Sequence, residues 1–131
     1  MALLLDTSAA IVLRDAETSA DDRLVALGSI PALSIVSRVE LEGGITANPL
    51  FAAQRRASLD AMLAVFPVIA FDRDCADAYR RIVEAAGFSR RKVIDRMIAA
   101  TALVHGLKVI TTNGKDFADV PGLQVDVWPV E

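Results

Sequence analysis

The chain of 131 residues contains one cysteine, Cys75, and one histidine, His105. A single cysteine excludes a disulfide within the chain, and a zinc site would need more His or Cys ligands than this. Cys75 is expected in the core of a helix and His105 at a helix C-terminus, so neither is expected to act in nucleophilic catalysis. The sequence also lacks a glycine-rich phosphate loop of the Walker or dinucleotide type.

Long apolar runs and an excess of positive charge are missing as well. The longest apolar runs fall far short of the ~18 residues needed to cross a bilayer, and the short apolar start has no basic segment before it. We therefore expect a cytoplasmic protein without a membrane span. A net charge of −3 argues against binding nucleic acid by bulk charge, although a bound cation would offset part of the negative charge locally.

Apolar residues are abundant instead, at 53% of the chain. This exceeds the usual share of roughly 45–50% and suits a sheet buried on both faces, or an extra surface buried in a dimer. The length predicts a single domain over residues 1–131.

Short apolar runs alternate with longer segments of helical periodicity, separated by glycine, proline and asparagine. This order predicts an α/β fold of three layers, α/β/α, around a central parallel sheet of four or five strands. The predicted strands are 2–6, 33–36, 68–71, 108–111 and 123–127. The predicted helices are 7–14, 20–27, 37–47, 50–65, 72–86 and 93–105, with Thr7 or Ser8 capping the first and Ser37 the third.

Four acidic residues fall where this topology brings chain segments to one edge of the sheet. Asp6 follows the first strand, Glu40 lies early in the helix after the second, Asp95 begins the helix before the fourth, and Asp116 follows the fourth. Ligands of such sheets bind at the carboxyl ends of the strands. Two carboxylates ~4 Å apart repel by roughly 4 kcal/mol at an effective dielectric of ~20, so a cluster favours a hard cation such as Mg²⁺ or Mn²⁺.

Each acid also has a purely structural interpretation. Asp6 and Asp95 could complement helix N-termini, Glu40 could complete a capping box with Ser37, and Asp116 could be a turn residue. The coincidence of all four at one edge favours the metal site.

Polar side chains next to these acids are candidates for supporting roles. Ser8, Thr112 and Asn113 could orient the carboxylates and hold water, whereas Thr7 and Thr111 fit capping and turn roles equally well. The basic segment 90–92 precedes Asp95 and could lie at the rim of such a site.

Four segments, in order and spread over nearly the whole chain, form a more specific signal. They are Leu4–Ser8 (LLDTS), Val39–Gly44 (VELEGG), Asp95–Ala102 (DRMIAATA) and Ile110–Phe117 (ITTNGKDF). Together they resemble PIN-domain proteins, and most of all the VapC group of toxins from bacterial toxin–antitoxin pairs. The ending, with Pro121-Gly122-Leu123 and Trp128, also fits that group.

The resemblance implies a Mg²⁺- or Mn²⁺-dependent endoribonuclease that hydrolyses RNA phosphodiester bonds. It also implies a homodimer, and a cognate VapB-like antitoxin whose C-terminal segment enters the active-site groove. Carried over by position, the catalytic and metal-binding residues are Asp6, Glu40, Asp95 and Asp116, and the helpers are Ser8 and Asn113. Thr112 stands where many relatives carry arginine. Glu42, close to Glu40, is a further candidate carboxylate.

Three other functions remain open at this stage. A receiver-type phosphoacceptor domain would have adjacent acids after its first strand, where this chain has Asp6 followed by Thr7. A phosphohydrolase with an aspartyl nucleophile would have a second Asp at the position of Ser8. A PIN-like module that binds RNA or protein without catalysis would share the fold.

Overall fold

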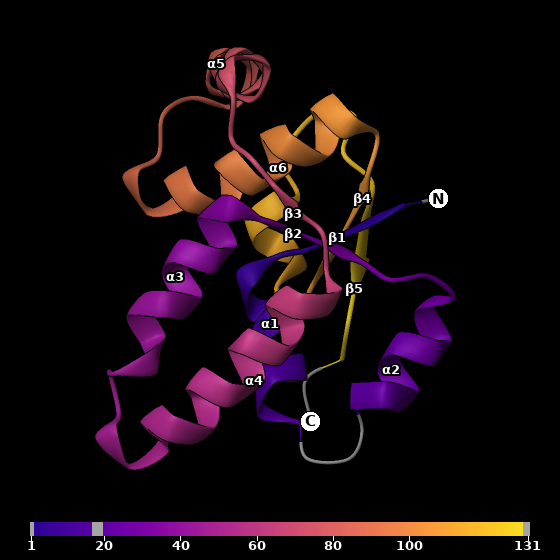
Figure 1. Ribbon diagram of the computed structural model, residues 1–131. Coiled ribbons are helices and arrows are strands. Elements are labelled where there is room, and N and C mark those ends of the chain that lie inside the picture. Colours follow the sequence, from indigo (N-terminus) through magenta and orange to yellow (C-terminus); the bar gives the residue numbers. More distant parts are fainter. Residues whose placement is uncertain (1, 17–19, 130–131) are drawn as a thin grey trace.

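The computed structural model describes residues 2–16 and 20–129, and its centre is one parallel sheet (Figure 1). The strand order is β3-β2-β1-β4-β5, and every neighbouring pair is parallel. Because β1 is the middle strand, its carboxyl end lies between those of β2 and β4. The strands are β1 (Leu3–Leu5), β2 (Ala32–Ser34), β3 (Val68–Ile69), β4 (Lys108–Thr111) and β5 (Val125–Val127).

Helices cover both faces of this sheet, which confirms the predicted three-layer α/β/α architecture (Figure 1). The helices are α1 (Thr7–Asp15), α2 (Ala20–Leu27), α3 (Ile35–Ile45), α4 (Ala52–Val65), α5 (Arg73–Ala86) and α6 (Val93–His105). Three short 3₁₀ helices, η1 (Pro49–Phe51), η2 (Arg90–Lys92) and η3 (Gly114–Phe117), lie in the connections.

The core is divided by the sheet, because successive side chains of a strand point to opposite faces. Leu3 and Leu5 pack with side chains of α1, α3 and α4. Leu4, between them, packs with side chains of α5 and α6. Over the described residues, no helix combines the length and the apolar character that crossing a membrane requires.

The best-predicted elements have clear signals at their ends. The bounds of α2, α6 and β4 agree with those predicted. Gly106 ends α6 with φ of +65°, a left-handed conformation that favours glycine, and its N–H is bonded to the carbonyl of Ala102.

The prediction for the second strand and the helix after it is wrong in detail. Strand β2 ends at Ser34, which caps α3 by accepting a hydrogen bond from the Val36 N–H at 3.0 Å. Ser37 is buried inside α3, so it is not a cap and Glu40 is not part of a capping box. Because Ile35 and Val36 are β-branched and such residues favour strands, the predicted strand extends past its observed end. Likewise, Asp6 rather than Thr7 or Ser8 caps α1.

Candidate active site

Asp6 lies at the junction of β1 and α1, where it is 3% exposed. Its Oδ1 accepts hydrogen bonds from the Ala9 N–H at 2.8 Å and the Ser8 hydroxyl at 2.7 Å. Its Oδ2 accepts one from the hydroxyl of Thr111, the buried last residue of β4. Both carboxylate oxygens are therefore held in fixed directions by the two central strands and the helix.

The pKa of the Asp6 carboxyl is raised above its usual value. Burial is the largest cause, because it disfavours the charged form, and the negative charge of Asp116 adds to it. The hydrogen bonds from Thr111, Ala9 and Ser8 oppose the shift, since they stabilise the carboxylate. The charged form of Asp6 is therefore disfavoured mainly by its burial.

Glu40 reaches the same edge from the second turn of α3. Its Oε1 accepts a hydrogen bond of 2.5 Å from the hydroxyl of Thr7, the first residue of α1. Ser34 caps α3, so Glu40 takes no part in capping. The side chain of Glu40 is exposed beside the start of α1. Thr7 thus links Glu40 to the residue that follows Asp6.

Asp95 lies in the first turn of α6 and is partly buried. Its pKa is raised from 3.8 to about 6; burial is the largest cause, followed by the negative charges of Asp116, Asp6 and Glu40. Arg91 has the opposite effect. Coulomb interactions fall with distance, so these contributions indicate that Asp95 lies near Asp116, Asp6 and Glu40.

Asp116 lies on η3, after β4, and its side chain is 19% exposed. Its Oδ2 accepts a hydrogen bond from the Asn113 carboxamide at 2.8 Å. Its Oδ1 pairs with the guanidinium of Arg91 at 3.1 Å. The basic segment 90–92 therefore lies at the rim of the acidic site, as its position before Asp95 suggested.

The predicted supporting residues also lie at this edge. Ser8 accepts a hydrogen bond from the Thr112 N–H at 3.0 Å, in addition to its bond to Asp6. Thr112 is placed by its backbone, and the Asn113 N–H donates to the hydroxyl of Thr111 at 3.0 Å. Thr111, for which a turn or capping role was an equally good expectation, bonds directly to the Asp6 carboxylate. Its place at the end of an apolar strand beside β1 was the available signal.

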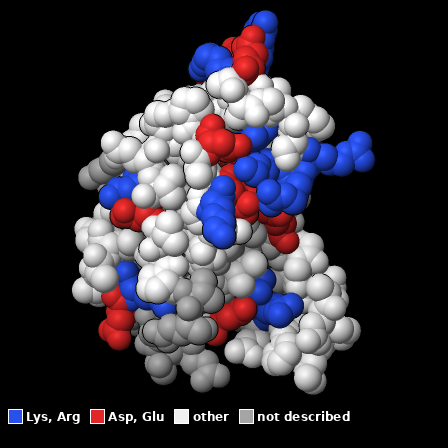
Figure 2. Space-filling view, turned by 180° about the vertical axis from the view of Figure 1, so that it is seen from behind, with Lys and Arg blue, Asp and Glu red and all other residues white. Residues whose placement is uncertain are grey.

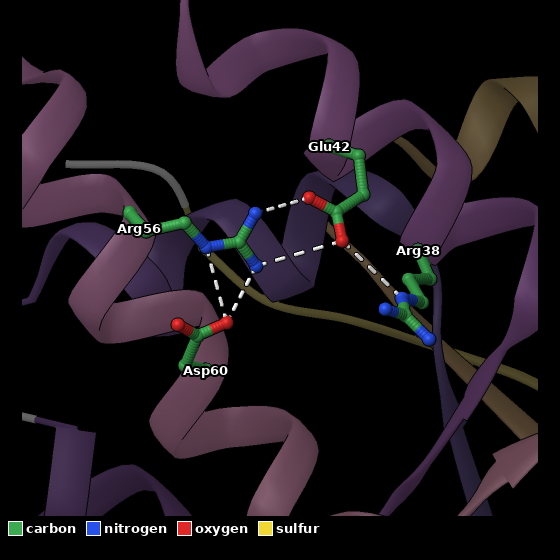
Figure 3. Close-up of polar contacts among 4 residues, drawn as sticks. All are labelled: Arg38, Glu42, Arg56 and Asp60. Carbon is green, nitrogen blue, oxygen red and sulfur yellow. Dashed lines mark hydrogen bonds and ion pairs between the residues drawn. The ribbon is translucent and has the colours of Figure 1, made fainter.

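Glu42 belongs to a different cluster of charges, between α3 and α4 (Figure 3). It forms ion pairs with Arg56 on α4 and, at 3.3 Å, with Arg38 on its own helix. Arg56 also pairs with Asp60 at 2.6 Å. The hydrogen bond from Arg56 is the main reason why the pKa of Glu42 is lowered. In this structure Glu42 links α3 to α4 through ion pairs with arginines. It does not belong to the group of four acids.

The four acids have the chemistry of a hard-cation site. Within the described parts of the chain, no three Asp, Glu, His or Cys side chains form a ready-made cluster for a metal ion. As the side chains lie, the oxygens of Asp6, Glu40 and Asp116 face hydroxyl, amide or guanidinium donors. The donor set is nevertheless all oxygen, and Asp95 shows the repulsion that a cation relieves. Such a set fits Mg²⁺ or Mn²⁺ rather than zinc.

Comparison with known proteins gives one family. The family described as "PIN domain" matches residues 3–123. A curated relative, Ribonuclease VapC1 of Rickettsia felis, is 33% identical over 72 residues. That match covers 53% of this chain and 53% of the relative, so the chain matches about half of the relative's length.

Solved structures of two toxin–antitoxin complexes match nearly the whole chain. A chain of VapBC-5 from Mycobacterium tuberculosis is 30% identical with a TM-score of 0.67, and 98% of each chain is covered. A chain of VapBC2 from Rickettsia felis, solved bound to a promoter DNA fragment, has a TM-score of 0.81. It is 24% identical, with 98% of this chain and 99% of that chain covered, and this likeness shows the fold alone.

Proposed function

Because the chain belongs to the PIN domain family, we propose that it is an endoribonuclease that uses Mg²⁺ or Mn²⁺ to hydrolyse RNA phosphodiester bonds. The proposal is supported by the position of Asp95, whose pKa is raised to about 6 by burial first and then by the negative charges of Asp116, Asp6 and Glu40. The relative named as a ribonuclease supports the choice of substrate. Because the chain belongs to this family, we do not propose a receiver domain or a phosphohydrolase with an aspartyl nucleophile.

We propose Asp6, Glu40, Asp95 and Asp116 as the residues that hold the divalent ion. Such an ion, when bound, lowers the pKa of water and offsets the negative charge of the phosphate group. Carboxylates also attract water and disfavour a free phosphate, so the same residues exclude anions until their charge is balanced.

The remaining polar residues orient these carboxylates. Thr111 and Ser8 fix the two oxygens of Asp6, Thr7 holds Glu40, and Asn113 holds Asp116. None of them needs to become a nucleophile, because water attacks phosphorus in this class of reaction. The single thiol, Cys75, is buried in α5, and its raised pKa keeps it protonated. Catalysis then depends on preorganised charge and on position.

We also propose that the chain is the toxin of a VapBC-type pair, with a VapB-like antitoxin as its partner, and that it forms a homodimer. The solved VapBC complexes that share its fold support the pairing. Exposed apolar side chains support a further buried surface: Val25 on α2 is 80% exposed and Val39, next to Glu40, is 66% exposed.

The test is cleavage of a structured RNA by the purified protein, with Mg²⁺ or Mn²⁺ and with a chelator. We expect cleavage only with the metal, and none by the Asp6→Asn variant. Asparagine caps a helix as well as aspartate does, so α1 and the circular dichroism spectrum should be preserved. Asp77→Asn, an exposed change in α5, is the matched control. Wild-type rates from Asp6→Asn would remove Asp6 from the site. RNA that is bound but never cut by the wild type would indicate a binding module.

A further inference from the structure

The loop between α5 and α6 combines an exposed aromatic ring with a run of cationic residues. Gly87 leaves α5 with φ of +84°, and Phe88 follows with 68% of its surface exposed. Arg90, Arg91 and Lys92 form η2 directly after it. In Figure 2, lysine and arginine side chains gather around acidic ones on one face of the molecule. Core packing gives no reason for an exposed phenylalanine here.

We propose that this loop is the surface on which the enzyme holds an unpaired stretch of RNA next to the acidic site. Phe88 stacks on a base, and Arg90 and Arg91 bind the phosphates on either side of it. The inference rests on the proposed ribonuclease function and adds the residues that select the strand.

Charge explains why a basic rim is needed at this place. A polyanion that approaches four carboxylates is repelled unless cations next to them attract it. Arg91 already touches the acids through its ion pair with Asp116, and its own side chain is 71% exposed. Arg90 is exposed and has no acidic partner among the residues that the structure describes. Both guanidinium groups can therefore reach solvent and phosphate oxygens.

Buried contacts hold the loop between α5 and α6 in place. Arg96, 2% exposed, donates a hydrogen bond to the carbonyl of Gly87 and pairs with Asp119 at 2.9 Å. Lys92 also pairs with Asp119, at 3.2 Å. The residues on both sides of Phe88 are thus fixed to α6 and to the segment after η3. A loop whose backbone is held in place before binding loses less conformational entropy when a ligand arrives.

The aromatic ring determines which kind of RNA fits. A base can stack on a side chain only if one of its faces is free, as in single strands, loops and bulges. The bases of a duplex are stacked on each other, and only phosphates and sugars are offered outside. A basic surface with an exposed phenylalanine therefore favours unpaired RNA over a duplex.

The first experiment measures RNA binding by fluorescence anisotropy in the Asp6→Asn background, so that the probe stays intact. The probes are a uridine oligonucleotide of about 12 nucleotides and a hairpin duplex of similar charge. We expect Phe88→Ala to weaken binding of the single strand at least about fivefold and to change duplex binding less than about twofold. Phe88→Tyr should restore it. Phe51→Ala, on η1 and 43% exposed in the parent, is the matched control and should change neither.

The second experiment measures how binding of the single strand depends on salt. Each phosphate contact that is lost lowers the slope of log K against log[salt] by roughly 0.7 for single strands. We expect this decrease for Arg90→Gln. Arg80→Gln, which changes another exposed arginine, on α5, should leave the slope unchanged.

Three results would overturn the inference: single-strand affinity unchanged in Phe88→Ala, an equal loss for strand and duplex, or a loss only in binding of a protein partner. The proposed nuclease function is judged separately, by cleavage with the otherwise unaltered chain. If the wild type cleaves and Phe88→Ala binds the single strand normally, the nuclease stands and the stacking role falls. If Phe88 is needed for binding and nothing is cleaved, the stacking role stands and the nuclease proposal falls.

Discussion

Replacing Asp95 with asparagine should make the metal-free protein more stable near neutral pH. Asparagine has the same shape as aspartate but carries no charge, so the change removes one of four mutually repelling groups. The pKa of Asp95 is raised from 3.8 to about 6, mainly by burial and then by the negative charges of Asp116, Asp6 and Glu40, so its charged form is disfavoured in the folded protein.

The size of the effect follows from the shift in the pKa of Asp95. A shift of about 2 units corresponds to a gross effect of about 3 kcal/mol. Asp95 is only partly buried, and solvent screening reduces this to roughly 1–2 kcal/mol. The variant also loses the favourable interaction of a charged residue with the N-terminus of α6, which is worth about 0.5 kcal/mol. We expect a net gain of about 1 kcal/mol, or roughly 3–5 °C in Tm.

The gain should depend on pH in a defined direction. The pKa is higher in the folded than in the unfolded state, so the folded protein binds the proton more tightly. The stability that this proton provides is fully present below about pH 4 and is lost as pH rises through about 6. The difference between variant and wild type should therefore be small at about pH 4 and reach its full size above about pH 7.

Urea unfolding with a chelator at the two pH values measures this difference. Asp74→Asn is the matched control, because Asp74 lies in the first turn of α5, is exposed, and does not face the acidic cluster. That variant should be slightly less stable than the wild type at both pH values. An Asp95→Asn protein that is no more stable than the wild type above pH 7 would show that the acids do not repel one another as the structure indicates.

Two further predictions concern the groups that hold the site in place. Thr111→Val removes a hydrogen bond to the Asp6 carboxylate and should raise the pKa of Asp6, moving the acid limb of the pH–rate profile for RNA cleavage up by about one unit. Thr101→Val, which removes a buried hydroxyl bonded within α6, should leave the profile in place. Arg96→Ala breaks the ion pair between buried Arg96 and exposed Asp119 and removes the packing of a buried side chain, so it should lower the free energy of unfolding by roughly 2 kcal/mol in urea melts, with partial recovery in Arg96→Lys. A loss below about 0.5 kcal/mol would mean that the pair is not structural.

The topology and the edge that carries the acids could be predicted because the sequence marks them locally. Apolar runs identify the strands, Gly106 ends α6, and the parallel order directs the strand ends to one side. Asp6 and Asp116 lie within a few residues of those strand ends, so an error of one or two residues in an element does not move them elsewhere.

The contacts that support the site could not be predicted, since they depend on residues distant in sequence. Arg96 on α6 is buried although charged side chains are usually exposed, because Asp119 and the carbonyl of Gly87 provide partners. Three-residue turns such as η2 have no periodicity to detect. For these reasons the ion pair between Arg91 and Asp116 appears only in three dimensions.

The position of Asp6 has a consequence for how this sequence can change over evolutionary time. One oxygen of its carboxylate caps α1 by accepting the Ala9 N–H, so the side chain that we propose for the reaction also stabilises the start of the helix. A copy of the gene freed from selection for catalysis still needs a polar cap there. Relatives that have lost catalysis should therefore change to Asn, Ser or Thr at this position before they change to Ala. Comparing this position among such sequences would test the expectation.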